Sequence, residues 1–84
     1  MQAILTHYVG PSNVRGSRYI ATNADGARAI VSADHSLDSF ENHWRAAQAL
    51  CNKLGWHGIC EAGATKRGYA FVFVSNPSHA VLTV

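Results

Sequence analysis

The sequence predicts a single α+β domain: a small antiparallel β-sheet with one amphipathic helix packed on one face. Three observations support this fold class. Apolar residues recur at helical spacing in one central segment, 38–54. Segments rich in β-forming residues lie on both sides of it, and 84 residues is the size of one domain. The expected order is β-β-β-α-β-β, which favours an antiparallel sheet with the helix on one face.

Three strands are expected before the helix. Residues 3–9 are rich in β-forming residues, and the Gly-Pro-Ser-Asn sequence at 10–13 ends this strand with strong turn chemistry. The next two strands are expected at 18–23 and 27–32. Asp25-Gly26 lies between them, and Asp-Gly tolerates the positive φ angles that tight hairpin turns demand. These two strands are therefore expected to pair as a hairpin.

The helix is expected at 38–54. Its apolar residues recur at spacings of four, three, four and three, which places them on one stripe. The stripe consists of Phe40, Trp44, Ala47, Cys51 and Leu54. Asp38 is the expected N-cap, and Gly55 is the expected stop after the last turn. The stripe is predicted to lie in the core, so Cys51 is expected to be buried and unreactive.

Two more strands and a tail are expected after the helix. Residues 56–60 are a short strand candidate, and 61–67 read as a polar turn rich in glycine and basic residues. The segment 69–74 is the strongest strand, because it is apolar on both alternating faces. That pattern favours a central place in the sheet or a partner on the second face. Residues 76–84 are expected to be a tail or a frayed edge strand.

The composition favours a folded chain and restricts its partners. Hydrophobic residues make up 48% and charged residues 14%, against a usual charged share of about 25%, so disorder is not expected. The net charge of +2 is mildly basic, unlike that of a dedicated nucleic-acid binder. The low charge also leaves a fairly apolar surface, so a homodimer through a sheet edge or helix face is left open.

No segment predicts secretion, membrane insertion or a metal site. The first residues lack a basic region and an apolar run, and no stretch approaches the roughly 20 apolar residues of a membrane helix. We therefore expect a cytoplasmic protein with no membrane partner, in which Cys51 and Cys60 are free thiols. These cysteines and His57 match no established zinc spacing and lack a fourth ligand. No metal and no cofactor is predicted.

A basic loop at 10–18 is the first candidate binding site. Glycine and proline shape a tight loop, in which Asn13 and Ser17 supply hydrogen-bond donors. Arg15 and Arg18 can each hold a phosphate or a carboxylate through two parallel hydrogen bonds. The loop lacks the Gly-Lys-Ser/Thr ending of a Walker A loop. The alternative is an ordinary strand connection whose asparagine and glycines serve backbone geometry.

A second candidate is the basic turn at Lys66 and Arg67, with Tyr69 beside it. An aromatic ring next to cations can stack on a base while the cations contact phosphates. Tyr69 begins a strand, however, and can equally be a core residue. If the turn folds near the first loop, the four cations would form one cationic rim. Its members would be Arg15, Arg18, Lys66 and Arg67.

Histidines near the predicted helix start form a third candidate. Asp34 precedes His35, and His43 lies near the first helical turn. A carboxylate can orient a neighbouring imidazole for acid–base chemistry. No serine or cysteine stands in a sequence typical of a nucleophile, so we do not expect an enzyme. The alternative is that both histidines are structural or lie on the surface.

Together these motifs resemble a group of small proteins encoded on phages and other mobile elements of bacteria. The resemblance covers residues 4–74. It is carried by the loop at 8–18, the Asp34-His35 pair, Glu41-Asn42-His43 at the helix start, Lys53-Leu54-Gly55-Trp56 and the strand sequence at 68–73. It implies a genomic setting rather than a mechanism. Small proteins of this setting without catalytic machinery often act by binding, and host defence is a common target.

The leading hypothesis is a non-enzymatic phage or mobile-element protein that counteracts host defence inside the bacterial cell. It would hold an anionic partner through the basic loop at 10–18, helped by Lys66 and Arg67. That partner would be the surface of a defence complex such as a CRISPR effector, or a nucleotide signal. Two alternatives remain: a nucleic-acid-associated accessory protein that contacts phosphates, and a small enzyme that uses His35 or His43.

Overall fold

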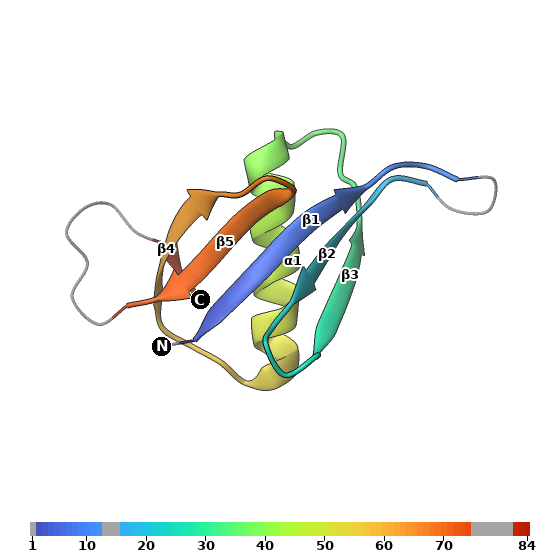
Figure 1. The fold of residues 1–84 in the computed structure, drawn as a ribbon. Helices are drawn as coiled ribbons and strands as arrows, with labels where there is room; N and C mark the ends of the chain where they lie inside the picture. Colours follow the sequence, from blue (N-terminus) through green and yellow to red (C-terminus); the bar gives the residue numbers. More distant parts are fainter. Residues whose placement is uncertain (1, 13–15, 75–81) are drawn as a thin grey trace.

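In the computed structural model, which describes residues 2–12, 16–74 and 82–84, one helix packs on a six-stranded antiparallel sheet (Figure 1). The predicted α+β class is confirmed. The elements are β1 (Ala3–Val9), β2 (Arg18–Thr22), β3 (Arg28–Ser32), α1 (Ser39–Leu54), β4 (Ile59–Ala64), β5 (Gly68–Phe73) and β6 (Leu82–Thr83). The strands lie in the order β3-β2-β1-β5-β4-β6. The strand expected at 69–74 thus has the predicted central position, between β1 and β4.

Up to the end of the helix, the observed elements agree with the expected ranges to within one residue at each end. After the helix, the bounds predicted for the strand at 56–60 are wrong. The observed strand, β4, begins at Ile59 and continues to Ala64, through residues expected in a turn. This segment is poor in β-forming residues, and it extends because its backbone pairs with β5 on one side and β6 on the other. Of the expected tail at 76–84, residues 76–81 lie outside the described residues, and Leu82–Thr83 form β6.

Both predicted caps of α1 are present. The Asp38 side chain accepts a hydrogen bond from the Glu41 backbone N–H at 2.7 Å, and its own backbone is extended. At the other end, Gly55 has φ 73° and ψ 24°, a left-handed conformation that favours glycine. The Trp56 N–H then donates to the Cys51 carbonyl at 2.9 Å, which closes the last turn. These local signals explain why the helix was predictable.

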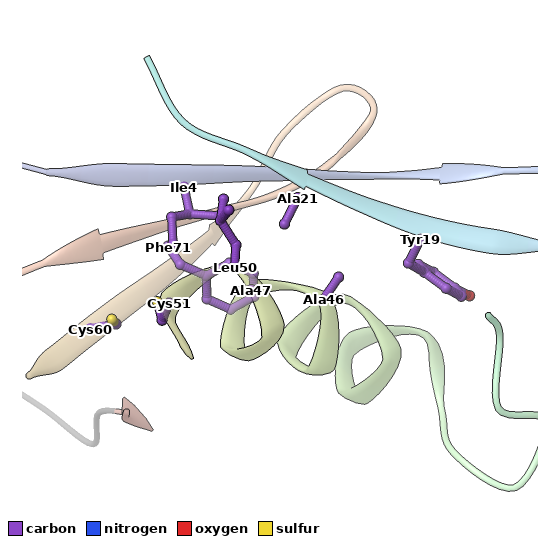
Figure 2. Close-up of a cluster of buried hydrophobic side chains, with 9 residues drawn as sticks. All are labelled: Ile4, Tyr19, Ala21, Ala46, Ala47, Leu50, Cys51, Cys60 and Phe71. Atoms are coloured by element: carbon purple, nitrogen blue, oxygen red, sulfur yellow. The ribbon is translucent and has the colours of Figure 1, made fainter. Parts of the chain in front are cut away.

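The core lies between α1 and one face of the sheet (Figure 2). It is made of small and large apolar side chains, with Phe71, Ile4 and Leu50 the largest fully buried ones. Because side chains alternate across a strand, Ile4 and Thr6 of β1 face the helix. Leu5 faces away and is 53% exposed. Within the described ranges, no helix is long and apolar enough to span a membrane.

The buried side of the helix is rotated from the predicted stripe. Ala47 and Cys51 are buried as expected, but Phe40, Trp44 and Leu54 are only partly buried. The most buried helix residues also include Asn42, His43, Ala46 and Leu50. The reason is size, since alanines let the helix lie close to the sheet while larger rings pack at the margin. There the Trp44 ring lies 5.3 Å from that of Phe71.

Candidate functional site

A cleft of about 680 Å³ lies at the start of α1. Figure 1 shows the helix start, the end of β1 and the turn between β4 and β5 at the same end of the molecule. The cleft is lined by the end of β1, the start of β2, the connection from β3 to α1, the first helical turns and the β4–β5 turn. Segments far apart in the sequence therefore converge on one concave surface.

A row of four rings forms one wall of this cleft. Tyr8 and Tyr19 have ring centroids 5.2 Å apart, Tyr19 and His43 4.8 Å, and His43 and Tyr69 5.0 Å. The three contacts are tilted or edge-to-face, the arrangements that aromatic pairs prefer. The Tyr8 hydroxyl donates to Ser17 Oγ at 2.9 Å. Tyr19 and His43 are buried, at 8% and 3% exposed, so the accessible ring surface of this wall comes from Tyr8 and Tyr69. That surface, with the polar tip of Tyr8, suits a planar ligand with hydrogen-bonding edges.

The Thr6 side chain of β1 holds the His43 ring in one orientation. Nδ1 of the ring lies 2.8 Å from Thr6 Oγ1, which also lies 3.3 Å from the Tyr69 carbonyl oxygen. A hydroxyl has one proton, so Thr6 donates to the carbonyl when Nδ1 carries a proton and to Nδ1 when it does not. Burial lowers the pKa of the His43 ring, and nearby His7 lowers it further. His43 is only 3% exposed, and among the described residues Thr6 is the one hydrogen-bond partner of its ring.

Gly68 allows this packing. A Cβ atom at this position would collide with the Thr6 carbonyl oxygen and would come within 2.8 Å of His43 Cε1. Any side chain at Gly68 would therefore push β5 away from β1 or His43 out of its place. Gly68 follows the basic residues of the β4–β5 turn, and its lack of a side chain leaves room for the His43 imidazole to pack against the sheet.

Asn42 fixes the connection that forms the opposite wall. Its Oδ1 accepts from the Asp34 N–H at 2.9 Å, and its Nδ2 donates to the carbonyls of Asp34 and Asp38 at 3.0 and 3.1 Å. The Asp34 carboxylate accepts hydrogen bonds from the hydroxyl and the N–H of Ser36, at 2.6 and 3.0 Å. These bonds, the hydroxyl's first, lower the pKa of Asp34. The wall is thus preorganised and carries one ionised carboxylate.

The cleft collects several of the residues proposed from the sequence. Five of them line it: Ser17, His35, His43, Arg67 and Tyr69. Arg18 lines an adjoining hollow that neither Lys66 nor Arg67 lines. Lys66 lines a hollow on the uncovered face of the sheet. Asn13 and Arg15 lie outside the described residues.

Sequence reasoning missed four residues of the site: Thr6, Tyr8, Tyr19 and Asn42. The sequence carries one sign of the role of Thr6. Thr6 lies two residues after Ile4, so both face the core, and a polar residue at a core-facing position needs a hydrogen-bond partner. No local pattern indicates that Tyr19 lies beside His43, because that contact depends on how β2 and α1 pack. Asn42 belongs to the Asn-His sequence at the helix start, but its hydrogen bonds to the preceding loop were not foreseen.

The two cysteines lie in the core and do not line the cleft. Cys51 and Cys60 are free and buried, and burial raises the pKa of Cys51 to about 11 and also raises that of Cys60. Both therefore remain protonated thiols at neutral pH. Across the described ranges, no three His, Cys, Asp or Glu side chains gather where they could hold a metal ion.

The cleft offers ring surface, hydrogen-bonding groups, one guanidinium and one carboxylate. Arg67 is exposed at its rim, and Ser39 brings the positive end of the helix dipole to the same opening. Such a lining can bind a planar polar ligand with an anionic group. In comparisons with protein-family models, with curated proteins and with solved structures, the chain matches none of them.

Proposed function

We propose that this chain is a non-enzymatic binding protein that holds a nucleotide in the cleft at the start of α1. One observation carries the proposal: the ring row of Tyr8, Tyr19, His43 and Tyr69 shares a cleft with Arg67. Stacking of a base on an aromatic side chain is worth about 1–3 kcal/mol. The volume of about 680 Å³ is within the ~300–1,000 Å³ of small-molecule sites.

The charges of the cleft favour an anionic group at one side. Arg67 is the cation that lines it, and a guanidinium binds phosphate through two parallel hydrogen bonds. Asp34 is the carboxylate that lines it, and Ser36 already occupies one of its oxygens. A phosphate at the Arg67 side would gain attraction, and the base would lie against the accessible ring surface of Tyr8 and Tyr69.

The biological setting follows from the resemblance to small phage and mobile-element proteins. We propose that the chain acts in the cytoplasm of a bacterial host and counteracts host defence by sequestering a nucleotide signal. The other expected partner, the surface of a CRISPR effector, is favoured less because the site is concave and lined by rings rather than broad and flat. The basic loop at 10–18 contributes Ser17 to the cleft.

Isothermal titration calorimetry with nucleosides, nucleoside monophosphates and cyclic dinucleotides tests the proposal. We expect at least one nucleotide to bind with a Kd below about 100 μM, which corresponds to about −5.5 kcal/mol. Arg67→Gln should weaken that binding about tenfold, as expected for loss of a charged hydrogen bond. Lys66→Gln is the matched control, because Lys66 is its sequence neighbour but does not line the cleft.

Two results would contradict the proposal. One is the absence of binding to every nucleotide by protein whose circular dichroism shows it folded. The other is nucleotide binding that Arg67→Gln and Lys66→Gln weaken equally, since that indicates general charge attraction. If the protein instead inhibits a CRISPR effector, and Arg67→Gln and Tyr69→Ala leave that inhibition intact, the effector surface is the partner and the nucleotide assignment is wrong.

A further inference from the structure

A second hollow of about 440 Å³ adjoins the cleft where β2 begins and β3 ends. It is lined by Gly16, Ser17, Arg18, Ile30, Ser32, Ala33 and His35. Ser17, Ala33 and His35 also line the cleft, so the two concave surfaces meet along these residues. A ligand that occupies both would pass over these shared residues.

Arg18 lines this hollow, and one nitrogen of its side chain is buried without a partner among the described residues. It belongs to β2, where it lies opposite Val9 on one side and Ser32 on the other. Its Nη1 is buried and has no hydrogen-bond partner in the part of the chain that the structure describes. Buried polar atoms are almost always hydrogen-bonded, and an unsatisfied one requires an explanation. Because arginine has only donors, the missing partner must be an acceptor.

The rest of the lining points to an anionic acceptor. Ser17 Oγ accepts from the Tyr8 hydroxyl, which leaves the proton of Ser17 to be donated. Ser32 adds a second hydroxyl and His35 a ring nitrogen, whereas no carboxylate is among the residues that line the hollow. Donors around one guanidinium, without a competing acid, match the oxygens of a phosphate group.

We propose that this hollow binds a second phosphate of the ligand whose base lies in the cleft. Neither the cleft nor the hollow is lined by both Arg18 and Arg67, so the two arginines take different phosphate groups. The ligand class is then a nucleotide with two separated phosphates, such as a dinucleotide. This inference rests on the proposed function, because the cleft must hold the base.

Calorimetry with AMP, GMP, cyclic di-AMP and cyclic di-GMP tests the inference, since the first two carry one phosphate and the last two carry two. We expect a cyclic dinucleotide to bind at least tenfold more tightly than its mononucleotide. Arg18→Gln should remove that gain and leave mononucleotide binding within about twofold. Arg28→Gln is the matched control, because Arg28 is exposed and lines neither concave surface.

Two companion measurements keep the inference falsifiable. Arg18→Gln should melt no lower than the wild type, since it deletes a buried nitrogen that lacks a partner, and Arg18→Lys should bind the dinucleotide with intermediate affinity. A variant that fails to fold would show that Arg18 has a structural role and overturn the inference. Inorganic phosphate should bind far more weakly than the dinucleotide, and equal affinity would identify a separate anion site instead.

The two proposals fail in different ways. If mononucleotides bind and Arg67→Gln weakens them, but a second phosphate adds nothing, the phosphate assignment to Arg18 is wrong and the cleft assignment stands. The same holds if Arg18→Gln and Arg28→Gln weaken the dinucleotide equally. If no nucleotide binds, neither these four nor any other of the panel used to test the cleft, both assignments are wrong.

Discussion

Thr6 Oγ1 lies 2.8 Å from Nδ1 of His43, and this buried contact joins β1 to α1 beneath the ring row of the cleft. It orients the one ring of the row that belongs to the helix. The same hydroxyl lies 3.3 Å from the Tyr69 carbonyl oxygen, so Thr6 of β1 contacts both α1 and β5. The cleft thus depends on a side chain that itself faces the core.

Thr6→Val tests this contact. Valine keeps the shape of threonine but removes the hydroxyl, which leaves Nδ1 of His43 buried without a partner. We expect the free energy of unfolding to fall by about 1–3 kcal/mol, measured by urea denaturation. Thr22→Val is the control, because Thr22 lies in the neighbouring strand but is not fully buried. Equal losses in the two variants would show that the hydroxyl of Thr6 contributes nothing specific.

Stability should depend on pH through His43. Its pKa in the folded protein is lowered, first by burial and then by His7, so the unfolded chain binds the proton more readily. The stabilisation is complete above the unfolded pKa of about 6.5 and is lost as the pH falls below it. His7, whose pKa is also lowered, acts in the same direction. We expect urea midpoints to decrease as the pH falls from 7 to 5.

The variant His43→Gln isolates this contribution. It should have a shallower decrease of stability between pH 7 and 5 than the wild type, whatever its absolute stability. His57→Gln, a change at an exposed histidine, should keep the wild-type slope. A slope unchanged by His43→Gln would mean that another group dominates the acid sensitivity.

Gly68→Ala should be one of the most disruptive small changes in the chain. The added methyl group would collide with the Thr6 carbonyl oxygen and crowd His43, and overpacking of this kind costs about 1–3 kcal/mol. Gly63→Ala is the matched control in the same hairpin, where a Cβ meets nothing within 4 Å. Thermal melts of the two variants check this, and similar melting temperatures would contradict the packing described for Gly68.

The two thiols should be protected in the native state. Cys51, with its pKa raised to about 11, and Cys60 are both buried, so the thiolate needed for reaction is scarce and inaccessible. We expect Ellman's reagent to modify them at pH 8 only as the protein opens, and both at once in concentrated urea. Rapid modification of either thiol without denaturant would contradict the packing of the core.

Basic side chains of the helix cover the outer edge of β3. Lys53 Nζ donates to the Arg28 carbonyl at 3.0 Å, and Arg45 Nη1 reaches the Ser32 carbonyl at 3.4 Å. Both carbonyls point away from β2, since Ala27 and Ala33 bond to the β2 side and the bonded positions alternate along this antiparallel ladder. Charged residues on an edge strand hinder pairing with another chain. A homodimer through this edge is therefore disfavoured.

The double variant Lys53→Ala, Arg45→Ala tests that role. With the carbonyls uncovered, we expect it to self-associate at lower concentration than the wild type in sedimentation velocity runs. Lys66→Ala, which removes a cation elsewhere, should sediment like the wild type. If both behave alike, the two basic side chains do not protect the edge.

Local signals sufficed for most of the fold. The caps at Asp38 and Gly55, the helical period and the Asp-Gly turn each act within a few residues, and the structure contains all of them. The failure at β4 has a physical cause, since Ile59–Ala64 has little β propensity and extends only through its neighbours. Strand conformation that depends on pairing cannot be read from the strand alone.

The cleft was less predictable because it depends on contacts between distant residues. Thr6 lies opposite Tyr69 only because β1 pairs with β5, and the sequence contains no local sign of that register. His43 and Tyr69 were both proposed as binding residues for their chemistry, but their edge-to-face contact was not. Residue type thus indicated several participants, whereas the pairing of strands decided which of them share a surface.

The most direct test of the central claim is a nucleotide titration followed by ¹H–¹⁵N correlation NMR. If the cleft holds a nucleotide, the largest shift changes should fall on amides around it, at Tyr8, Ser17, His43 and Gly68. Amides of the uncovered sheet face outside both concave surfaces, such as Leu5 and Val72, should change little. Changes centred on Leu5 and Val72, or none at millimolar nucleotide, would contradict the claim that this cleft is the binding site.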